Sequence, residues 1–369
     1  MIRVIFILVI LLVATMRITA QEHVLKPGFD GKEYLDMVSV TLLQADSISP
    51  DNKIPMPEKY ERVYRSPEVG LFNRWDLWVS ENKTAVISIR GTTHNAISWF
   101  ENYFAAMVAA NGSLQINDST VFNYHLASDQ KASVHVGWLL ALAYLAPTIT
   151  QKIDEYSKQG IRDFIIMGHS QGAAISFLTT SYLYYLQKEG KIPVDIRFKT
   201  YCSAAPKPGN LYYVYDYDFI TRNGWSFTVV NASDWVPETP FTVQTLKNFN
   251  PVNLFGGIDD MLKTQSFFKR VAIKHVIGKM RKPPAKAQSR YEKYLGDYMF
   301  KQVRKTLPQL KKPDFIQDNN YMRAGVPIVL EPDSAYKKEF PDNPKQIFMH
   351  HKLWPYYSMA RRYYVDQAH

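Results

Sequence analysis

The chain has 369 residues, of which 46% are hydrophobic and 14% aromatic, so it is long and apolar enough to form a large core. Its single cysteine, Cys202, excludes an internal disulfide and the usual thiolate zinc sites, and the apolar run around it indicates a buried side chain. The net charge of +10 is compatible with an anionic surface, a nucleic acid or an acidic partner, so the position of the charge matters more than its total.

The N-terminus has the composition of an export signal. A positively charged start precedes an unbroken apolar core at 4–13 and a candidate cleavage site between Ala20 and Gln21. As a helix, the apolar run from Val4 to Met16 would span about 20 Å, which is less than the roughly 30 Å hydrocarbon core of a bilayer. Arg17 is unfavourable so close to a cleavage site, and an uncleaved anchor is therefore the alternative. We expect cleavage near Ala20–Gln21 and a secreted, periplasmic or cell-surface protein.

Apolar periodicity predicts strands that alternate with helices along the rest of the chain. Helices are expected at 28–44, 139–160 and 173–186, with an amphipathic stretch at 96–110. Strands are expected at 70–80, 84–90, 163–167, 195–202 and 226–231. Strands that alternate with helices of this length indicate an α/β fold, with a mostly parallel central sheet flanked by helices.

The stretch Gly168-His-Ser170-Gln-Gly172 joins an apolar strand to a helix. This is the G-x-S-x-G pattern in the strand–turn–helix setting of a nucleophile elbow. Glycines are expected there because the turn is sharp, and side chains at those positions would collide with the neighbouring strand and helix. The turn would lift the Ser170 hydroxyl above the sheet edge at a helix N-terminus, where backbone N–H groups can stabilise an oxyanion. A chance Gly-Ser-Gly turn is the alternative.

A serine nucleophile needs a base, and the base needs an orienting carboxylate. In elbow hydrolases the acid and then the histidine follow the serine along the chain. Asp234 comes in the loop directly after the apolar strand at 226–231, and an Asx turn before Trp235 is the less favoured alternative. Four histidines follow it: His275, His350, His351 and His369. His369 is the terminal residue and His275 lies in a lysine-rich helical run, so His350 and His351 are favoured. Periodicity alone does not choose between these two.

Several motifs together resemble the class 3 (fungal-type) lipases, a branch of the α/β-hydrolases. Besides the elbow, they are Ile89-Arg-Gly-Thr92, His135-Val-Gly-Trp138, Ala205-Pro-Lys-Pro-Gly209, Asn231-Ala-Ser-Asp-Trp-Val-Pro237, and His351 with Tyr356. They occur in the family's order and cover roughly residues 28–240 and 346–360. No single motif is specific, but the combination is.

The resemblance implies a serine ester hydrolase that acts on lipid esters and needs no metal or organic cofactor. Ser170 would be the nucleophile, Asp234 the orienting acid and His351 the general base. The spacing to the following tyrosine favours His351 over its neighbour His350. Thr92 and Gln171 match the two oxyanion-hole positions: each would give its backbone N–H, and the first often also gives its hydroxyl.

The chain departs from the family at two positions near the oxyanion hole and in one long segment. Gln171 stands where the family often has leucine, and Asn102 where many members have aspartate. The segment 241–345 separates the acid from the base. We expect one α/β-hydrolase domain over residues 21–369, with 241–345 as a helical, cap-like insertion.

The insertion contains the positive charge. Residues 262–312 include fifteen basic and two acidic residues, a net charge of +13, so the rest of the chain is slightly acidic. Apolar residues recur there at helical spacing, which indicates a helical cap that contacts an anionic membrane or lipid surface. The alternative is an ordinary solvated helix, and nucleic-acid binding is disfavoured because no supporting motif is present.

The sequence leaves other functions open. A carboxylesterase or lysophospholipase acting on smaller esters is the alternative within the enzyme class. A catalytically silent hydrolase fold that binds lipid is the alternative outside it. The acyl chain, the head group, the mobility of the insertion and the oligomeric state do not follow from the sequence.

Overall fold

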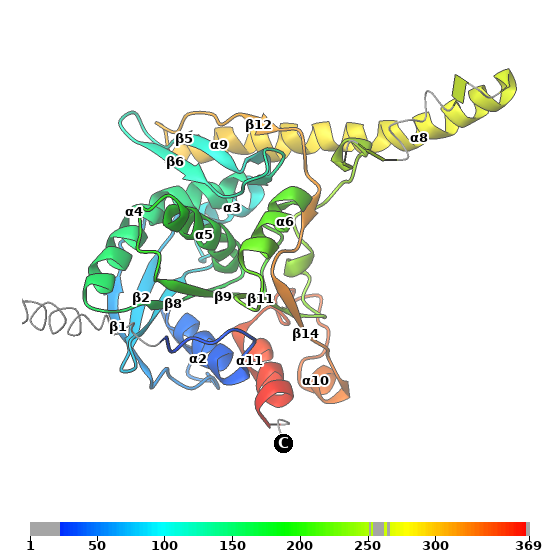
Figure 1. Ribbon diagram of the computed structural model, residues 1–369. Coiled ribbons are helices and arrows are strands. Elements are labelled where there is room, and N and C mark those ends of the chain that lie inside the picture. The colour runs from blue at the N-terminus through cyan, green and yellow to red at the C-terminus, as the bar shows by residue number, and fades with distance from the viewer. Residues whose placement is uncertain (1–22, 251, 254–261, 264–265, 367–369) are drawn as a thin grey trace, which may run out of the picture.

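The computed structural model describes residues 23–250, 252–253, 262–263 and 266–366 (Figure 1). The expected export signal at 1–20 and His369 therefore lie outside the described residues. Within the described part of the chain, no helix is long and apolar enough to cross a membrane.

A seven-stranded sheet runs through the centre of the molecule (Figure 1). Its strands lie in the order β1 (Tyr60–Arg65), β2 (Trp75–Ser80), β3 (Thr84–Ile89), β8 (Asp163–His169), β9 (Arg197–Ser203), β11 (Ser226–Asn231) and β14 (Val326–Leu330). β1, β2 and β3 pair antiparallel, and every neighbouring pair from β3 to β14 is parallel. The α/β fold with a mostly parallel sheet is thus confirmed.

Helices cover both faces of this sheet and make two hydrophobic cores. α4 (Val136–Lys158) and α5 (Gln171–Lys188) lie on one face, and α2 (Gly31–Leu42) and α11 (Leu353–Arg361) lie on the other (Figure 1). Successive side chains of β8 alternate between the cores: Phe164 and Ile166 pack in the first, and Ile165 and Met167 in the second. Burial on both faces explains why β8 is a continuous apolar run.

Shorter elements complete the body. A five-stranded sheet contains β12 (Phe315–Ile316), β4 (Met107–Ala109), β7 (Ser133–His135), β10 (Gly209–Asn210) and β13 (Tyr321–Met322). A hairpin is formed by β5 (Asn111–Gln115) and β6 (Val121–His125). The remaining α-helices of the body are α3 (Trp99–Tyr103), α6 (Leu211–Ile220) and α10 (Ser334–Glu339), and 3-10 turns occupy Ala96–Ser98, Val236–Glu238 and Leu246–Asn248.

Most predicted elements shift by a few residues at their ends, and three differ for an identifiable physical reason. The strand expected at 70–80 begins only at Trp75, because Gly70 and Phe72 adopt φ angles of 61° and 69° in a tight turn. The amphipathic stretch at 96–110 is divided between α3 and β4. α4 begins before residue 139, because the His135 ring accepts the Trp138 N–H at 3.3 Å and caps the helix.

The insertion is only partly helical, so the prediction of a helical 241–345 is wrong for its last part. α8 (Phe267–Tyr291), the π-helical segment η4 (Glu292–Tyr298) and α9 (Met299–Thr306) follow one another directly and form what we call the basic rod (Figure 1). After the rod, β14 joins the central sheet and pairs in parallel with β11. Pro327 is tolerated in β14 because this strand is at the edge of the sheet, where its missing N–H breaks no ladder.

Candidate active site

The elbow positions Ser170 at the carboxyl end of β8. Ser170 has a φ of 60° and a ψ of −130°, and α5 begins at the next residue. A Cβ on Gly168 would lie 2.2 Å from the backbone carbon of Gly172, and a Cβ on Gly172 would lie 2.3 Å from the Ile89 carbonyl oxygen. Both positions therefore require glycine, because a side chain there would collide with backbone atoms that cannot move aside. Ser170 is in the strained left-handed region, which non-glycine residues rarely adopt without a functional reason.

The structure brings Ser170, His351 and Asp234 into one chain of hydrogen bonds. Nε2 of His351 lies 2.8 Å from the Ser170 Oγ, and Nδ1 lies 2.7 Å from Oδ2 of Asp234. The Asp234 side chain has no exposed surface, whereas that of His351 is 12% exposed. The serine and the histidine both line a pocket of about 700 Å³, so a reactant can reach the serine.

Asp234 is held as a carboxylate. Burial alone would raise its pKa, but hydrogen bonds from His351, the Val236 N–H at 3.0 Å and the Tyr356 hydroxyl at 2.7 Å outweigh burial and hold the pKa below its ordinary value. Ionised Asp234 accepts a hydrogen bond from the Nδ1–H of His351. The proton of the neutral ring is then on Nδ1, and Nε2 is free to accept the serine proton.

The neighbouring histidine points elsewhere. Nδ1 of His350 lies 2.8 Å from the Tyr336 hydroxyl and Nε2 lies 3.0 Å from Asp342. The geometry therefore separates the two histidines that periodicity could not separate, and only His351 contacts Ser170.

His169, the residue before the serine, supports the backbone of His351. Burial and the nearby His351 ring lower the pKa of His169 to about 3, so the ring is neutral. Its Nε2 lies 2.7 Å from the His351 carbonyl oxygen and must carry the proton, because a carbonyl only accepts. Its Nδ1 then accepts from Ser203 at 3.1 Å, and Ser203 is in turn 2.8 Å from the Tyr34 hydroxyl. This chain fixes the loop that presents His351.

Thr92 and Gln171 lie beside each other at the expected oxyanion position. The Thr92 Oγ1 is 2.6 Å from the Gln171 Oε1, and Asn102 Nδ2 lies 2.9 Å from the former and 3.1 Å from the latter. Gln171 is the first residue of α5, so its N–H has no partner within the helix. Among the described residues, no acceptor bonds the Thr92 N–H. Both backbone donors are thus available to an oxyanion.

A buried carboxylate lies behind this pair. Glu101 is fully buried, and its two oxygens accept from Gln171 Nε2 and, at 2.5 Å, from Asn73 Nδ2. Burial raises the pKa of Glu101 well above its ordinary value, although both amide donors favour the ionised form.

No described residue of the segment 241–345 lines the pocket at Ser170. The lining comes from the end of α2 and the loop after it, the Thr92 loop, Trp99, the elbow, and residues 348–354. The expected cap over the site is therefore absent from the described structure. Likewise, no cluster of metal-ligating side chains occurs among the residues that the structure describes.

Comparison with known families assigns the central part of the chain. The family model "Lipase (class 3)" matches residues 86–244, which contain the Thr92 loop, the elbow and Asp234. The match covers less than half of the chain, and it shows that this part is similar to the class 3 lipases. The matched part carries the strand–elbow–helix unit and the acid that a serine ester hydrolase needs, and this similarity supports the function proposed below.

Solved lipase structures are similar to this chain at low identity. A mutant form of MDLA from Penicillium cyclopium is 18% identical, covering 57% of this chain and 73% of that one, with a TM-score of 0.41. The Rhizomucor miehei triacylglyceride lipase is 16% identical, covering 58% and 77%, with a TM-score of 0.43. A triacylglycerol lipase from Penicillium expansum is 15% identical, covering 57% and 75%, with a TM-score of 0.41. A search of curated proteins gave no match.

Sequence reasoning missed two side chains in the candidate active site. His169 lies inside the elbow motif, and only its contacts with the His351 carbonyl oxygen and with Ser203 identify its role. Glu101 lies in the amphipathic stretch and gives no signal in the sequence, because an acidic residue in a short helix is ordinarily exposed. The polar Gln171 in place of leucine was the one available clue, since a buried amide needs partners.

Proposed function

We propose that this protein is an exported lipid-ester hydrolase in which Ser170 is the nucleophile, His351 the base and Asp234 the orienting acid. The observation that carries this proposal is the unbroken chain from the Ser170 Oγ through the imidazole to Asp234, at 2.8 and 2.7 Å. A hydroxyl, an imidazole and a buried carboxylate in this order are the constellation that serine acyl transfer requires.

The proposed reaction has two halves. As the Ser170 Oγ bonds the ester carbonyl carbon, Nε2 of His351 takes the hydroxyl proton, and Asp234 stabilises the resulting imidazolium. The N–H groups of Thr92 and Gln171 hold the oxyanion. The imidazolium then gives its proton to the leaving alkoxide, and an acyl-serine remains. Water repeats the sequence on the acyl-serine, which releases the fatty acid and restores the serine.

The pocket supports an apolar acyl group as the bound part of the substrate. Leu42, Ile54, Trp99, Phe348 and Trp354 contribute to its lining beside Ser170 and His351. Burying methylene groups against such walls stabilises binding by about 0.8 kcal/mol each, so long acyl chains should be preferred.

Turnover of a series of esters tests the proposal. The mature protein is expected to hydrolyse a short-chain chromogenic ester and to favour longer acyl chains presented as an emulsion. Ser170→Ala should lower kcat by at least about 10⁴-fold. A preference for short, soluble esters would instead indicate a carboxylesterase. Turnover that Ser170→Ala does not change, or no turnover at all, would indicate a silent hydrolase fold.

Export is the second element of the proposal. It is supported by the composition of residues 1–20, which have a basic start, an apolar core and a small residue before Gln21. Expression of the full chain followed by N-terminal sequencing of the protein recovered outside the cytoplasm should give Gln21 as the first residue. Retention of the intact N-terminus in the membrane fraction would favour an uncleaved anchor.

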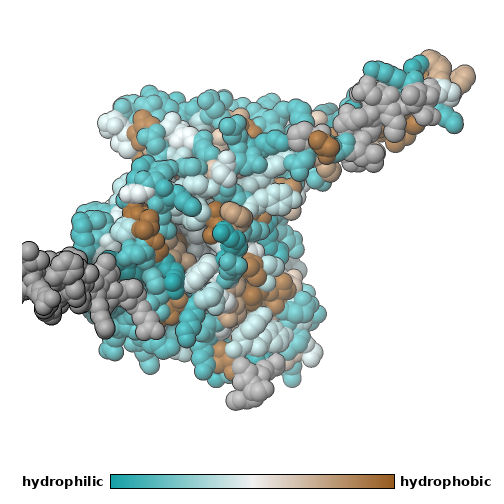
Figure 2. All heavy atoms as spheres, in the orientation of Figure 1, coloured by the Kyte–Doolittle hydropathy of each residue, from teal (hydrophilic) through white to brown (hydrophobic). Residues whose placement is uncertain are grey.

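Contact with an anionic lipid surface is the third element, and the basic rod is the proposed contact. α8 extends away from the body (Figure 1), and hydrophobic and hydrophilic residues are intermixed along it (Figure 2). Phe268 is 83% exposed, Met280 64% and Val276 56%, on a 25-residue helix that also has eight lysine and arginine side chains. A helix that exposes both apolar and basic side chains fits an interface of acyl chains and anionic headgroups.

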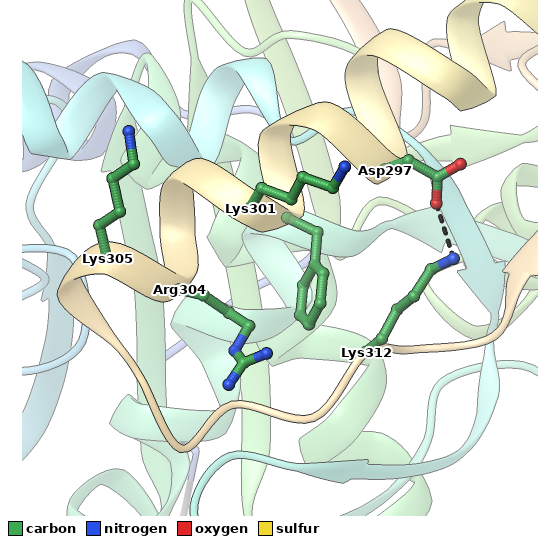
Figure 3. Close-up of a pocket in the computed structure, with 6 residues that line it drawn as sticks. Asp297, Lys301, Arg304, Lys305 and Lys312 are labelled. Carbon is green, nitrogen blue, oxygen red and sulfur yellow. Dashed lines mark ion pairs between the residues drawn. The ribbon is translucent and has the colours of Figure 1, made fainter.

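Basic residues also converge where the rod joins the body. Lys301, Arg304, Lys305 and Lys312 surround a pocket of about 620 Å³ in which the one acidic residue is Asp297 (Figure 3). Asp297 pairs with Lys312 at 2.6 Å, which leaves the pocket with an excess of positive charge. We propose that phosphate groups of the lipid surface bind here.

Vesicle binding tests the lipid contact with a charge-matched control. Lys274→Gln/Lys279→Gln on α8 is expected to weaken binding to anionic vesicles by about 30-fold, because each lysine near the surface contributes about 1 kcal/mol. Lys337→Gln/Lys338→Gln removes the same charge from α10, on the opposite side of the body (Figure 1). Equal losses for the two double variants would mean that only net charge matters, and the contact proposed for the rod would be wrong.

A further inference from the structure

The hydrogen bonds around the oxyanion position have a fixed direction. The indole Nε1 of Trp138 lies 3.1 Å from the Oδ1 of Asn102. An indole N–H can only donate, so the oxygen of the Asn102 amide must face Trp138 and its NH₂ must face the other way. The two hydrogens of that NH₂ point to Thr92 Oγ1, at 2.9 Å, and to Gln171 Oε1, at 3.1 Å.

This direction determines where the Thr92 proton points. The Thr92 oxygen accepts a hydrogen from Asn102, and it lies 2.6 Å from the Gln171 Oε1, which also accepts from Asn102. The amide oxygen cannot donate, so the single hydroxyl proton of Thr92 is the one that bridges the two side chains. That proton is already donated to Gln171 and is therefore not free to be donated to an oxyanion.

The chain ends on Glu101. Because the oxygen of the Gln171 amide faces Thr92, its nitrogen must donate to the Oε2 of Glu101. The other oxygen of Glu101 accepts from Asn73 Nδ2 at 2.5 Å. Each oxygen of the Glu101 side chain thus accepts a hydrogen from a different amide, at a site with no exposure.

We infer that Glu101 is a positioning residue of the oxyanion hole, and that the hole uses the backbone N–H groups of Thr92 and Gln171 without the Thr92 hydroxyl. The inference rests on the proposed function, since it concerns the same oxyanion. The two residues that present the N–H groups are the two whose side chains the network clamps. Glu101 does not touch the reacting atoms and acts only through Gln171.

The location of Glu101 supports this role. It lies on α3 next to Asn102, so one short helix holds the network from both ends. A Cβ on Gly137, at the start of α4, would lie 2.0 Å from the Glu101 carbonyl oxygen, which shows how closely α3 is packed onto α4. Helix-borne groups in a packed setting hold an N–H donor more accurately than a free loop does.

The test separates positioning from stability by measuring kcat per active site. The mature protein and each variant are titrated with a fluorophosphonate to count competent sites, and kcat and KM are measured on a short-chain ester. Glu101→Leu is expected to lower kcat about tenfold at unchanged KM, since loss of a whole oxyanion donor costs about 10²–10³ and a misplaced one costs less. Glu101→Gln should recover most of that loss, because the Asn73 amide can turn to meet the new NH₂.

If Glu101→Leu does not fold, two further variants test the inference. Glu101→Leu/Gln171→Leu replaces the polar pair by an apolar pair and should exceed either single variant in kcat per site. Thr92→Val removes the hydroxyl at constant shape and should cost tenfold or less. A loss near 10²-fold would show that the hydroxyl stabilises the oxyanion and would overturn the inference.

Labelling and turnover of the wild-type protein distinguish a failure of the proposed function from a failure of the role inferred for Glu101. If wild-type protein is not labelled at Ser170 and shows no turnover, the proposed function fails. If it is labelled and active, while Glu101→Leu keeps the wild-type kcat per titrated site, the proposed function stands and the role of Glu101 is wrong.

Discussion

Removal of the Tyr356 hydroxyl should destabilise the protein in a pH-dependent way. The hydroxyl donates to Asp234 at 2.7 Å inside a fully buried site, and the same Oδ2 accepts from His351. A hydrogen bond to a charged group contributes about 1.5–3 kcal/mol, so Tyr356→Phe should lower the free energy of unfolding by about 2 kcal/mol near pH 7. The loss should also lower kcat, because Asp234 would orient His351 less firmly.

The sign of the pH dependence follows from the depressed pKa of Asp234. A carboxyl with a folded-state pKa below its unfolded value of about 3.9 contributes stability that is complete above that value and is lost as the pH falls through the folded pKa. Tyr356→Phe raises the folded pKa and so reduces this contribution. The difference between wild type and variant should therefore be largest above about pH 5 and should shrink below about pH 4.

Urea unfolding at pH 7 and at the lowest pH where both proteins remain folded measures this difference. Tyr357→Phe is the matched control, because Tyr357 is the adjacent buried tyrosine of α11 and its hydroxyl has no hydrogen-bond partner among the described residues. The control should show a smaller change that does not vary with pH. An equal loss at both pH values for Tyr356→Phe would refute the reasoning that the hydroxyl stabilises an ionised Asp234.

Three other substitutions have definite expected outcomes. Gly168→Ala should cost more than about 4 kcal/mol or prevent folding, since its Cβ would lie 2.2 Å from the Gly172 carbon, and thermal unfolding measures this. Gln171→Leu should lower the free energy of unfolding by about 2–4 kcal/mol, because it leaves buried polar partners without a hydrogen bond at a cost of about 1–3 kcal/mol each. This is expected even though the family that the sequence resembles often has leucine there. A stability equal to that of wild type would contradict the hydrogen-bond network. His350→Ala should keep kcat within about threefold while His351→Ala loses at least about 10³-fold, and the reverse order would exchange their roles.

The sequence predicted the central part of the fold well because its strands are buried on both faces. β11 has the predicted limits, Ser226–Asn231, and all six of its residues are buried, so apolar composition alone marks the strand. The Gly168 and Gly172 positions were likewise predictable, because a backbone collision at a fixed turn depends only on local sequence.

β14 could not be predicted from its residues. It contains Pro327, which argues against a central strand, and it follows a long basic helix, so the pattern gave no reason to place it in the sheet. Its pairing with β11 spans almost a hundred residues of sequence, from Val229 to Ile328, and depends on the tertiary arrangement. The described residues of 241–345 do not line the pocket at Ser170, because helical periodicity predicts a helix but does not specify where the helix lies.

The residues proposed for catalysis were predictable, whereas the residues that hold them were not. Ser170, Asp234 and His351 belong to motifs that recur together, and the structure brings them within hydrogen-bond distance. Glu101 and His169 act through buried partners far away in sequence, and only the folded chain shows which donor meets which acceptor.

Covalent labelling tests the central claim most directly. The mature protein is incubated with a fluorophosphonate probe and digested, and the labelled peptide is mapped, with Ser170→Ala and a known serine hydrolase as controls. The account predicts one label, on Ser170, that is absent from Ser170→Ala, because the pocket at this serine has no described covering segment and the base is 2.8 Å away. A folded protein that leaves Ser170 unlabelled while the control hydrolase reacts would contradict it.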